Sequence, residues 1–231
     1  MEVIMSLVVA ENLTKIYQMG TGKVAALNGV SFSLEKSSFI SFIGPSGSGK
    51  TTLLNMIGCL DSPTSGIVTV DGQDTSFLSR SKKADFRGRK IGFIFQEFNL
   101  FPVLSVYENV EYPLIMVQDV GASERRERIE KVLEAVGMAE HAAKRPSQLS
   151  GGQKQRTAVA RALVANPAII LADEPTANLD HETSMKIISL MKSMRDDFGT
   201  TFVFSTHDPK VVGEAEKIYV LEDGKIVREE A

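Results

Sequence analysis

The sequence predicts an α/β protein whose buried strands are interrupted by an all-helical segment. Short apolar runs bounded by glycine or polar residues occur early and late in the chain, which is typical of buried strands. From Glu97 to about Ala165 this pattern disappears and helical periodicity takes its place. A glycine-rich loop follows the apolar run SFISFIG and precedes a predicted helix, which is the arrangement of a phosphate-binding α/β unit.

The N-terminal part alternates apolar and polar residues, as half-buried strands do. We interpret the N-terminal MEVIMSLVVAENL as the start of a first strand that runs through SLVVAENLTKIY. A helix is predicted over residues 51–60. The further strands predicted in this part are VAALNGVSFSLE, SFISFIG, SGIVTVDG and KIGFIFQ.

The middle and the end of the chain differ in periodicity. In SERRERIEKVLEAVG, the apolar residues Ile129, Val132, Leu133 and Val136 follow the i, i+3, i+4, i+7 spacing of an amphipathic helix. Strands return in AIILADE, TTFVFSTHD and KIYVLEDGKIV, with a helix around TSMKIISLMKSM. We therefore expect an α/β core that consists of an early and a late part of the chain, with helices between them.

Composition narrows the class of protein. The 231 residues are 43% hydrophobic and 24% charged, as in ordinary globular proteins. The net charge of −3 argues against a dedicated nucleic-acid binder, which usually carries a basic excess. No apolar run approaches the roughly 20 residues of a membrane span, so another chain would have to supply any spans. The single cysteine, Cys59, is expected to be a small buried hydrophobe.

The loop GPSGSGKTT, residues 44–52, fits the G-x-x-x-x-G-K-[ST] pattern. Backbone N–H groups can surround phosphate oxygens only where side chains do not block them, which explains Gly44, Gly47 and Gly49. Lys50 adds a full charge at the β- and γ-phosphates, and Thr51 offers a hydroxyl to Mg²⁺. An incidental glycine turn is the alternative, but the strand before and the helix after favour a phosphate site.

Polar side chains follow three other apolar runs. IILADE delivers Asp173 and Glu174 to the sheet edge where ligands collect. We expect Asp173 to hold Mg²⁺, and Glu174 to act as the base for a water that attacks the γ-phosphate. Gln96 and His207 end two further strands and can bond both phosphate and water. A solvated acidic loop and a structural histidine are the alternatives.

A second glycine pair lies in QLSGGQKQR, residues 148–156. Ser150 and Gln153 form the S-x-x-Q capping box of a helix start. A plain cap does not need Gly151 and Gly152, because each glycine costs a helix about 1 kcal/mol relative to alanine. Bare N–H groups at a helix N-terminus form an anion site. We therefore expect two copies arranged head to tail, each loop closing on the other copy's nucleotide.

These motifs together resemble the nucleotide-binding subunit of an ATP-binding-cassette (ABC) transporter. In that family's order they are Walker A (GPSGSGKTT), the Q-loop (FQ), the signature (LSGGQ), Walker B (IILADE), the D-loop (NLD) and the H-switch (STHD). The resemblance covers essentially the whole chain. It implies a RecA-like P-loop core, an antiparallel β subdomain and an inserted all-helical subdomain. It also implies ATP sandwiched between two subunits, with hydrolysis driving a membrane partner.

The resemblance also implies roles for individual residues. The catalytic residues are Glu174, His207 and Gln96. The metal-binding residues are Thr51, Gln96 and Asp173. The nucleotide-binding residues are Tyr17, whose ring would stack on adenine, Gly44, Ser46, Gly47, Ser48, Gly49, Lys50, Thr51 and Thr52, together with Ser150, Gly151, Gly152 and Gln153. The cofactors implied are ATP and Mg²⁺.

The implied organisation is one nucleotide-binding domain over residues 1–231. Residues 1–96 and 166–231 would form the RecA-like core with the β subdomain, and residues 97–165 the helical subdomain. The implied partners are a second copy in the ATP-bound state and an integral membrane permease subunit, with no nucleic acid. The implied location is the cytoplasm, peripheral on the inner face of the cell membrane.

Within the family, three stretches resemble the lipoprotein-release and macrolide-export class: LLNMIGCLDSPTSG, IGFIFQEFNLFPVLSVYENVEYPL and ADEPTANLD. An importer subunit for polar amino acids, or a subunit of a non-transport complex that transmits force, remains an alternative. One departure from the family pattern is EKSSF, residues 35–39, which lacks the usual turn glycine.

The stretch after Gln96 carries an excess of apolar residues. We expect it to lie beside a groove that receives the membrane partner. The alternative is that all five apolar side chains belong to the core of the helical segment. These residues are Phe98, Leu100, Phe101, Val103 and Leu104.

Overall fold

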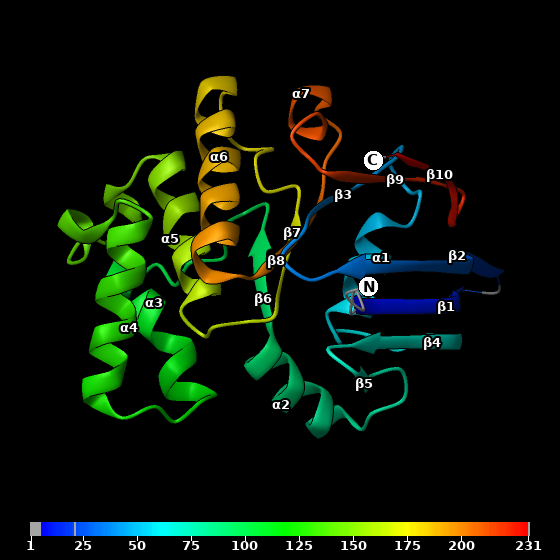
Figure 1. Cartoon of the computed structure of the whole chain (residues 1–231), viewed down its shortest axis with the longest axis horizontal. Helices are drawn as coiled ribbons and strands as arrows, with labels where there is room; N and C mark the ends of the chain where they lie inside the picture. Colours follow the sequence, from blue (N-terminus) through cyan, green and yellow to red (C-terminus); the bar gives the residue numbers. More distant parts are fainter. Residues whose placement is uncertain (1–5, 21, 231) are drawn as a thin grey trace, which may run out of the picture.

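The chain forms a six-stranded sheet, a smaller four-stranded sheet and a helical region at one side (Figure 1). The computed structural model describes residues 6–20 and 22–230. The predicted first strand is present from Ser6 onward, and its first five residues lie outside the described part. The α/β class expected from the sequence is confirmed.

The six-stranded core sheet contains the short apolar runs predicted to be buried strands. All neighbouring pairs are parallel except β10 with β9. The predicted strand KIYVLEDGKIV is in fact a hairpin of two strands, because Asp223 and Gly224 turn the chain with positive φ angles. In spatial order the strands are β10 (Lys225–Glu230), β9 (Lys217–Glu222), β3 (Phe39–Ile43), β8 (Thr201–Ser205), β7 (Ile169–Asp173) and β6 (Ile91–Phe95).

The four-stranded sheet is antiparallel and consists of the early alternating segments. Beyond Thr14, β1 pairs only with β2, because its pairing with β4 ends at Thr14 and Ser65. The end of the β1–β2 hairpin is therefore a two-stranded ribbon. In spatial order the strands are β2 (Gly22–Glu35), β1 (Ser6–Met19), β4 (Ser65–Val70) and β5 (Gln73–Asp74).

The predicted helices are present, but one is shorter than expected, and two further helices, Arg80–Lys90 and Pro209–Val212, were not predicted. The helix predicted over residues 51–60 ends at Ile57, where Gly58 caps it and Cys59 takes a positive φ of 54°. Helix α2 was not predicted, because RSKKADFRGRK has one large apolar residue and no apolar stripe. The helices are α1 (Lys50–Ile57), α2 (Arg80–Lys90), α3 (Val106–Met116), α4 (Ala122–Ala135), α5 (Gly151–Leu163), α6 (His181–Phe198) and α7 (Pro209–Val212), with 3-10 turns η1 (Ala139–His141) and η2 (Pro146–Gln148).

Both faces of the core sheet are buried, but against different elements. On β8, Phe202 and Phe204 belong to the hydrophobic cluster that includes α5 and α6, whereas Val203 belongs to the cluster that includes α1 and the antiparallel sheet. Successive side chains of a strand point to opposite faces, so one strand serves both clusters. This double burial explains why the core strands are nearly continuous apolar runs.

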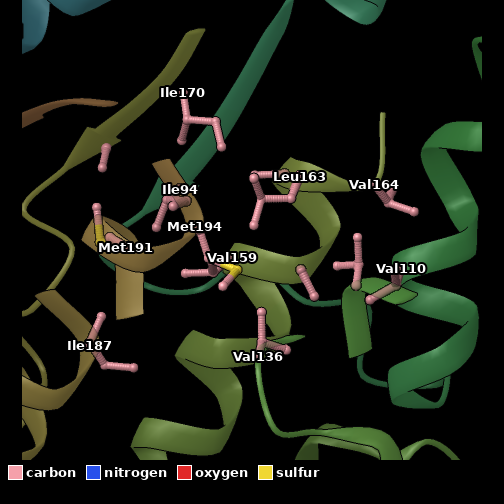
Figure 2. Packing of buried hydrophobic residues seen from close by; sticks show 14 of the residues in the cluster. Ile94, Val110, Val136, Val159, Leu163, Val164, Ile170, Ile187, Met191 and Met194 are labelled. Atoms are coloured by element: carbon pink, nitrogen blue, oxygen red, sulfur yellow. The ribbon is translucent and has the colours of Figure 1, made fainter. Parts of the chain in front are cut away.

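Helix α5 joins the helical region to the core sheet. Val159 and Leu163 of α5 lie in one buried cluster with Ile94 of β6 and Met191 of α6 (Figure 2). Val110 of α3 belongs to the same cluster. The helical region is therefore anchored to the sheet by a shared hydrophobic core.

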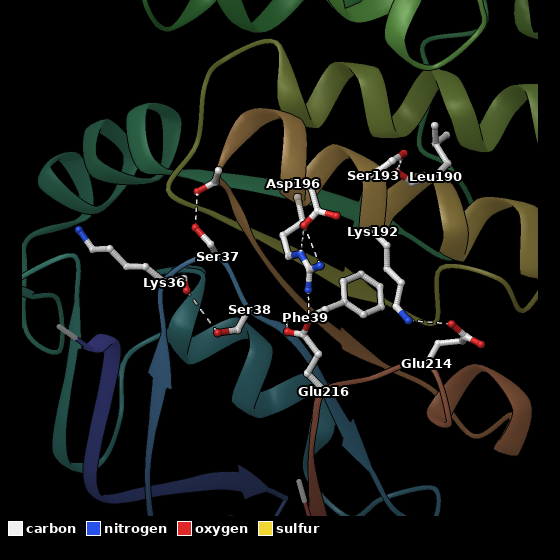
Figure 3. Close-up of polar contacts among 12 residues, drawn as sticks. Lys36, Ser37, Ser38, Phe39, Leu190, Lys192, Ser193, Asp196, Glu214 and Glu216 are labelled. Carbon is white, nitrogen blue, oxygen red and sulfur yellow. Dashed lines mark hydrogen bonds and ion pairs between the residues drawn. The ribbon is translucent and has the colours of Figure 1, made fainter. Parts of the chain in front are cut away.

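Polar contacts fix the C-terminal half of α6 to the sheet. The Glu216 carboxylate accepts the Phe39 N–H at 3.0 Å and pairs with Arg195 of α6 (Figure 3). Lys192 of α6 pairs with Glu214 at 2.7 Å.

Ser37, in the EKSSF stretch, takes the left-handed conformation with φ 55°, where the family's usual glycine would fit without strain.

Within residues 6–20 and 22–230, no helix combines the length and apolar character needed to cross a membrane.

Cys59 is buried, as the sequence predicted. Burial raises the pKa of its thiol, so it remains a neutral, inert side chain.

We expect Leu163→Ala to lower the free energy of unfolding by about 2–5 kcal/mol, because it leaves a cavity in the core shared by α5 and the sheet. Leu163 is 1% exposed. Urea unfolding followed by circular dichroism measures the loss. Val227→Ala on exposed β10 is the matched control and is expected to change stability by less than about 0.5 kcal/mol. A loss below about 1 kcal/mol for Leu163→Ala would contradict the anchoring role of α5.

Candidate nucleotide site

A pocket of about 650 Å³ lies where β3 passes through the glycine-rich loop into α1. The carboxyl ends of the parallel strands β3, β7 and β8 meet at this edge, which is where α/β sheets bind ligands. Most of the residues predicted for the phosphate and its metal come together here. The lining residues are Ala26, Gly44, Pro45, Ser46, Gly47, Ser48, Gly49, Lys50, Thr51, Thr52, Asp173, Glu174 and His207.

Two of the loop glycines are required by close backbone approach. A Cβ on Gly44, at φ 146°, would lie 2.0 Å from the carbonyl oxygen of Leu221. A Cβ on Gly49, at φ 106°, would lie 2.4 Å from the carbonyl oxygen of Ala26. Any other residue would push the loop away from β2 and β9. The glycines thus shape the loop as well as leaving its N–H groups accessible.

The Lys50 ammonium lies inside the loop that it follows. Its Nζ donates to the carbonyl oxygens of Gly44 at 2.8 Å and Pro45 at 2.9 Å. Both acceptors are neutral, and among the described residues no carboxylate pairs with Lys50. A cation with only neutral partners at a helix N-terminus favours an anionic ligand.

Three elements contribute oxygen atoms to one point beside Lys50. The Thr51 hydroxyl at the start of α1 donates to Asp173 Oδ2 at 2.9 Å. The Ser205 hydroxyl at the end of β8 donates to Asp173 Oδ1 at 2.6 Å. Ser205 therefore orients the carboxylate that the sequence predicted as a metal ligand, and sequence reasoning missed it.

Glu174 leaves β7 in a left-handed turn with φ 48°. Its N–H lies within hydrogen-bonding distance of both the carbonyl oxygen and the hydroxyl of Ser205, which holds this uncommon conformation. Its Oε1 lies 2.9 Å from Nδ1 of His207. The Glu174 side chain is 18% exposed and the His207 side chain 74% exposed. A partly buried carboxylate with an exposed imidazole partner suits a general base.

Gln96 and Tyr17 are predicted site residues that do not line this pocket. Gln96 follows β6, at the edge of the sheet, and its carbonyl oxygen accepts the Asn178 side-chain amide at 2.9 Å. Tyr17 lies on β1 opposite Val24, and its hydroxyl donates to Asp61 at 3.0 Å. Both side chains remain predicted contacts of the nucleotide.

The second glycine pair begins α5, and the predicted capping box is present. Ser150 Oγ accepts the Gln153 N–H at 3.3 Å, and Gln153 Oε1 accepts the Ser150 N–H at 2.9 Å. A Cβ on Gly152 would lie 2.7 Å from the Thr183 methyl group of α6. Packing against α6 thus supplies a reason for glycine that the sequence did not reveal. The pocket around Lys50 is lined by none of the residues 150–153.

His141 contacts the side chain of Gln153, the glutamine of the capping box. Its Nε2 lies 2.8 Å from the Nε2 of Gln153, and its Nδ1 is buried with no hydrogen-bond partner in the described residues. The contact fixes the Gln153 amide so that its oxygen faces the Ser150 N–H. Nothing in the sequence marks His141 for this role, because the two residues meet only through the turn between α4 and α5.

Comparison with known proteins decides the family. A protein-family model described as ABC transporter matches residues 27–177. The chain belongs to the ABC transporter family. An ABC transporter ATP-binding protein of Methanocaldococcus jannaschii, MJ0796, is 48% identical over 95% of each chain. The solved dimer of MJ0796 with ADP and Pi, in a post-hydrolysis state, matches with a TM-score of 0.87 and 46% identity, covering 96% of this chain and 97% of that one.

Two further relatives carry functional names. The lipoprotein-releasing system ATP-binding protein LolD of Pseudoalteromonas translucida is 42% identical over 96% of this chain and 95% of that protein. The macrolide export ATP-binding/permease protein MacB of Syntrophobacter fumaroxidans is 45% identical over 96% of this chain but only 31% of that protein. This ABC chain therefore corresponds to an ATP-binding subunit, and it is an ATPase.

In this ABC ATPase, we expect Glu174→Gln to stop ATP hydrolysis while ATP binding is retained. The amide keeps the shape of the side chain but cannot accept a proton from the attacking water. Phosphate release would fall by at least about 100-fold, and ATP titration would give the wild-type affinity. Glu130→Gln on exposed α4 is the control. Hydrolysis by Glu174→Gln at the wild-type rate would show that another group is the base.

Proposed function

We propose that this ABC ATPase binds Mg-ATP between two copies arranged head to tail and drives a separate integral membrane permease. The observation that carries the proposal is the division of the phosphate-binding groups. Lys50 and Asp173 line one pocket, whereas Ser150 and the two glycines at the start of α5 lie outside it. A second copy can bring its signature loop to this pocket, and the dimeric state of the MJ0796 structure supports that arrangement.

The donor atoms beside Lys50 fit Mg²⁺. Thr51 and Asp173 offer a hydroxyl and a carboxylate, the hard oxygen ligands that Mg²⁺ prefers. Among the described residues, no group of three or more His, Cys, Asp or Glu side chains forms a metal site. Mg²⁺ is commonly held by one or two carboxylates together with substrate phosphates. When bound, the ion would neutralise negative charge on the phosphates.

The residues of the chain then have separate roles in ATP hydrolysis. The N–H groups of the loop and Lys50 bind the phosphates and hold the γ-phosphate in line for attack. Glu174 accepts a proton from the attacking water at a carboxylate oxygen. In the tautomer with the proton on Nδ1, His207 donates to Glu174 Oε1 and leaves Nε2 to face the pocket. Gln96 would approach from β6, next to β7.

A groove of about 660 Å³ supports the membrane partner. It lies between α2, β6, α3 and α5 and is lined by Phe101, Met116 and Val117 among others. These three side chains are 39%, 62% and 41% exposed. None of the five apolar residues of the FNLFPVL stretch is buried, so they do not form the core of the helical region. We infer that a helical segment of the permease docks here on the cytoplasmic face of the membrane, in the lipoprotein-release or macrolide-export class.

Mixing two inactive variants tests the head-to-tail arrangement. We expect Lys50→Ala and Ser150→Arg each to be inactive, and their mixture to recover activity, because a mixed dimer has one site with both defects and one with neither. At equal mixing about half of the dimers are mixed, so about a quarter of wild-type sites return at most. Different affinity tags on the two variants isolate the mixed dimer. A single chain whose Ser150 contacts the phosphates bound by its own Lys50 would contradict the shared site.

We expect Met116→Glu to reduce the amount of the subunit that co-purifies with membranes by about tenfold, because a charge in an apolar contact is costly. ATP hydrolysis by the isolated subunit would be unchanged. Phe77→Glu is the matched control, since Phe77 is 67% exposed and lies outside the groove. Equal effects of the two substitutions, or none from Met116→Glu, would remove the groove as the docking site.

A further inference from the structure

The turn that follows α1 is held by three cations from other elements. Lys15, Lys83 and Arg87 donate to oxygen atoms of residues 59–62 over distances of 2.6–3.0 Å. Lys83 is only 6% exposed, so its contacts are shielded from water. The turn thus has one defined position between the antiparallel sheet and α2, and it gives the side chain of Asp61 a defined position too.

The Asp61 carboxylate reaches from this turn to β1. Its Oδ2 accepts from the Tyr17 hydroxyl at 3.0 Å and lies 2.7 Å from the Lys15 ammonium. Its Oδ1 accepts the Ser62 N–H at 2.6 Å. Burial raises the pKa of Asp61, but the hydrogen bonds from Lys15, Ser62 and Tyr17 together hold it below the ordinary value. Asp61 is therefore an ionised acceptor, and Tyr17 remains the donor.

Lys15 also lies against the aromatic ring, with its Nζ 4.8 Å from the centroid of Tyr17. A cation on one face of the ring leaves the opposite face for another planar group. Burial, and then the hydrogen bond with Asp61, raise the pKa of Tyr17 above its ordinary value. Tyr17 lies opposite Val24 of β2, two residues before Ala26, which lines the phosphate pocket, so Tyr17 lies near the margin of that pocket.

The backbone alone does not fix the ring. At Tyr17, β1 pairs with β2 at Val24 but has no partner on its other side in the described residues. A two-stranded ribbon is marginally stable by itself. The direction of the ring therefore depends on its side-chain contacts, of which the bond to Asp61 joins it to the end of α1.

We propose that Asp61 is a positioning residue for nucleotide binding: it fixes the ring of Tyr17 as a platform for the adenine base. Helix α1 then connects the two halves of the site, because its first residue is Lys50 and the turn at its end holds Tyr17. The inference rests on the proposed function, in which Tyr17 stacks on adenine. Asp61 contributes without touching the nucleotide, by reducing the ordering that binding requires.

Steady-state kinetics of the full-length protein with Mg-ATP tests the role of Asp61. In Asp61→Asn only one acceptor oxygen is left for the Ser62 N–H, Lys15 and the Tyr17 hydroxyl, and in Tyr17→Phe the ring stays but the hydroxyl is lost. We expect each variant to raise the KM for ATP about fivefold with kcat unchanged. The double variant would match the single ones, because both remove the same hydrogen bond. Inorganic tripolyphosphate, which has no base, would inhibit all of them with the wild-type inhibition constant.

Asp71→Asn is the matched control. The Asp71 carboxylate is also held by two lysines, Lys36 at 3.2 Å and Lys90 at 2.8 Å, and it does not contact Tyr17. We expect its KM and kcat to be those of the wild type.

An unchanged KM for ATP in Asp61→Asn would overturn the proposal. So would an equal rise of this KM and of the inhibition constant for tripolyphosphate, because that would indicate a disturbed phosphate loop. If Asp61→Asn does not fold, Tyr17→Phe is the deciding variant, and an unchanged KM in it would also overturn the proposal. Absence of ATPase activity in the wild type would instead contradict the proposed function.

Discussion

The parallel alignment of β3, β8 and β7 is the constraint on which the rest of the structure depends. It places Lys50 and Thr51, which follow β3, beside Asp173 at the end of β7 and Ser205 at the end of β8. Such a sheet must be buried on both faces, and the alternating side chains of β8 serve two separate clusters. Stability and chemistry therefore share the same strands: burial fixes their register, and the register fixes the site.

Each buried face of the core sheet packs against elements that carry further predicted site residues. On one face, α1 packs with the antiparallel sheet, and Asp61 in the turn after α1 accepts a hydrogen bond from Tyr17 of β1. On the other, α5 packs on β6 and carries the signature loop outside that pocket. The core thus joins Tyr17 to the end of α1 and holds the start of α5 outside the phosphate pocket. This separation is the physical reason for expecting a second copy to complete the site.

The sequence predicted the features that depend on local chemistry. Apolar runs identified the buried strands, and glycines beside Lys50 identified the phosphate loop. The sequence did not predict α2, because its buried residue is the polar Lys83 and its one large apolar residue, Phe86, is only partly buried against the core. Nor did it predict Ser205, whose bond to Asp173 joins residues 32 positions apart.

Glycine pairs show the limit of sequence reasoning most clearly. The sequence explained Gly151 and Gly152 by access of an anion to backbone N–H groups. In the structure, Gly152 also lies where a Cβ would contact Thr183 of α6. The structure therefore supplies a packing reason for Gly152, whereas the predicted anion site at this pair needs a partner copy.

A structure of the Glu174→Gln variant with Mg-ATP tests the shared site most directly, because the nucleotide would remain intact between the subunits. We expect the Ser150 hydroxyl of one copy to lie within hydrogen-bonding distance of the γ-phosphate held by Lys50 of the other copy. A γ-phosphate contacted by Ser150 and Lys50 of the same chain would contradict this arrangement.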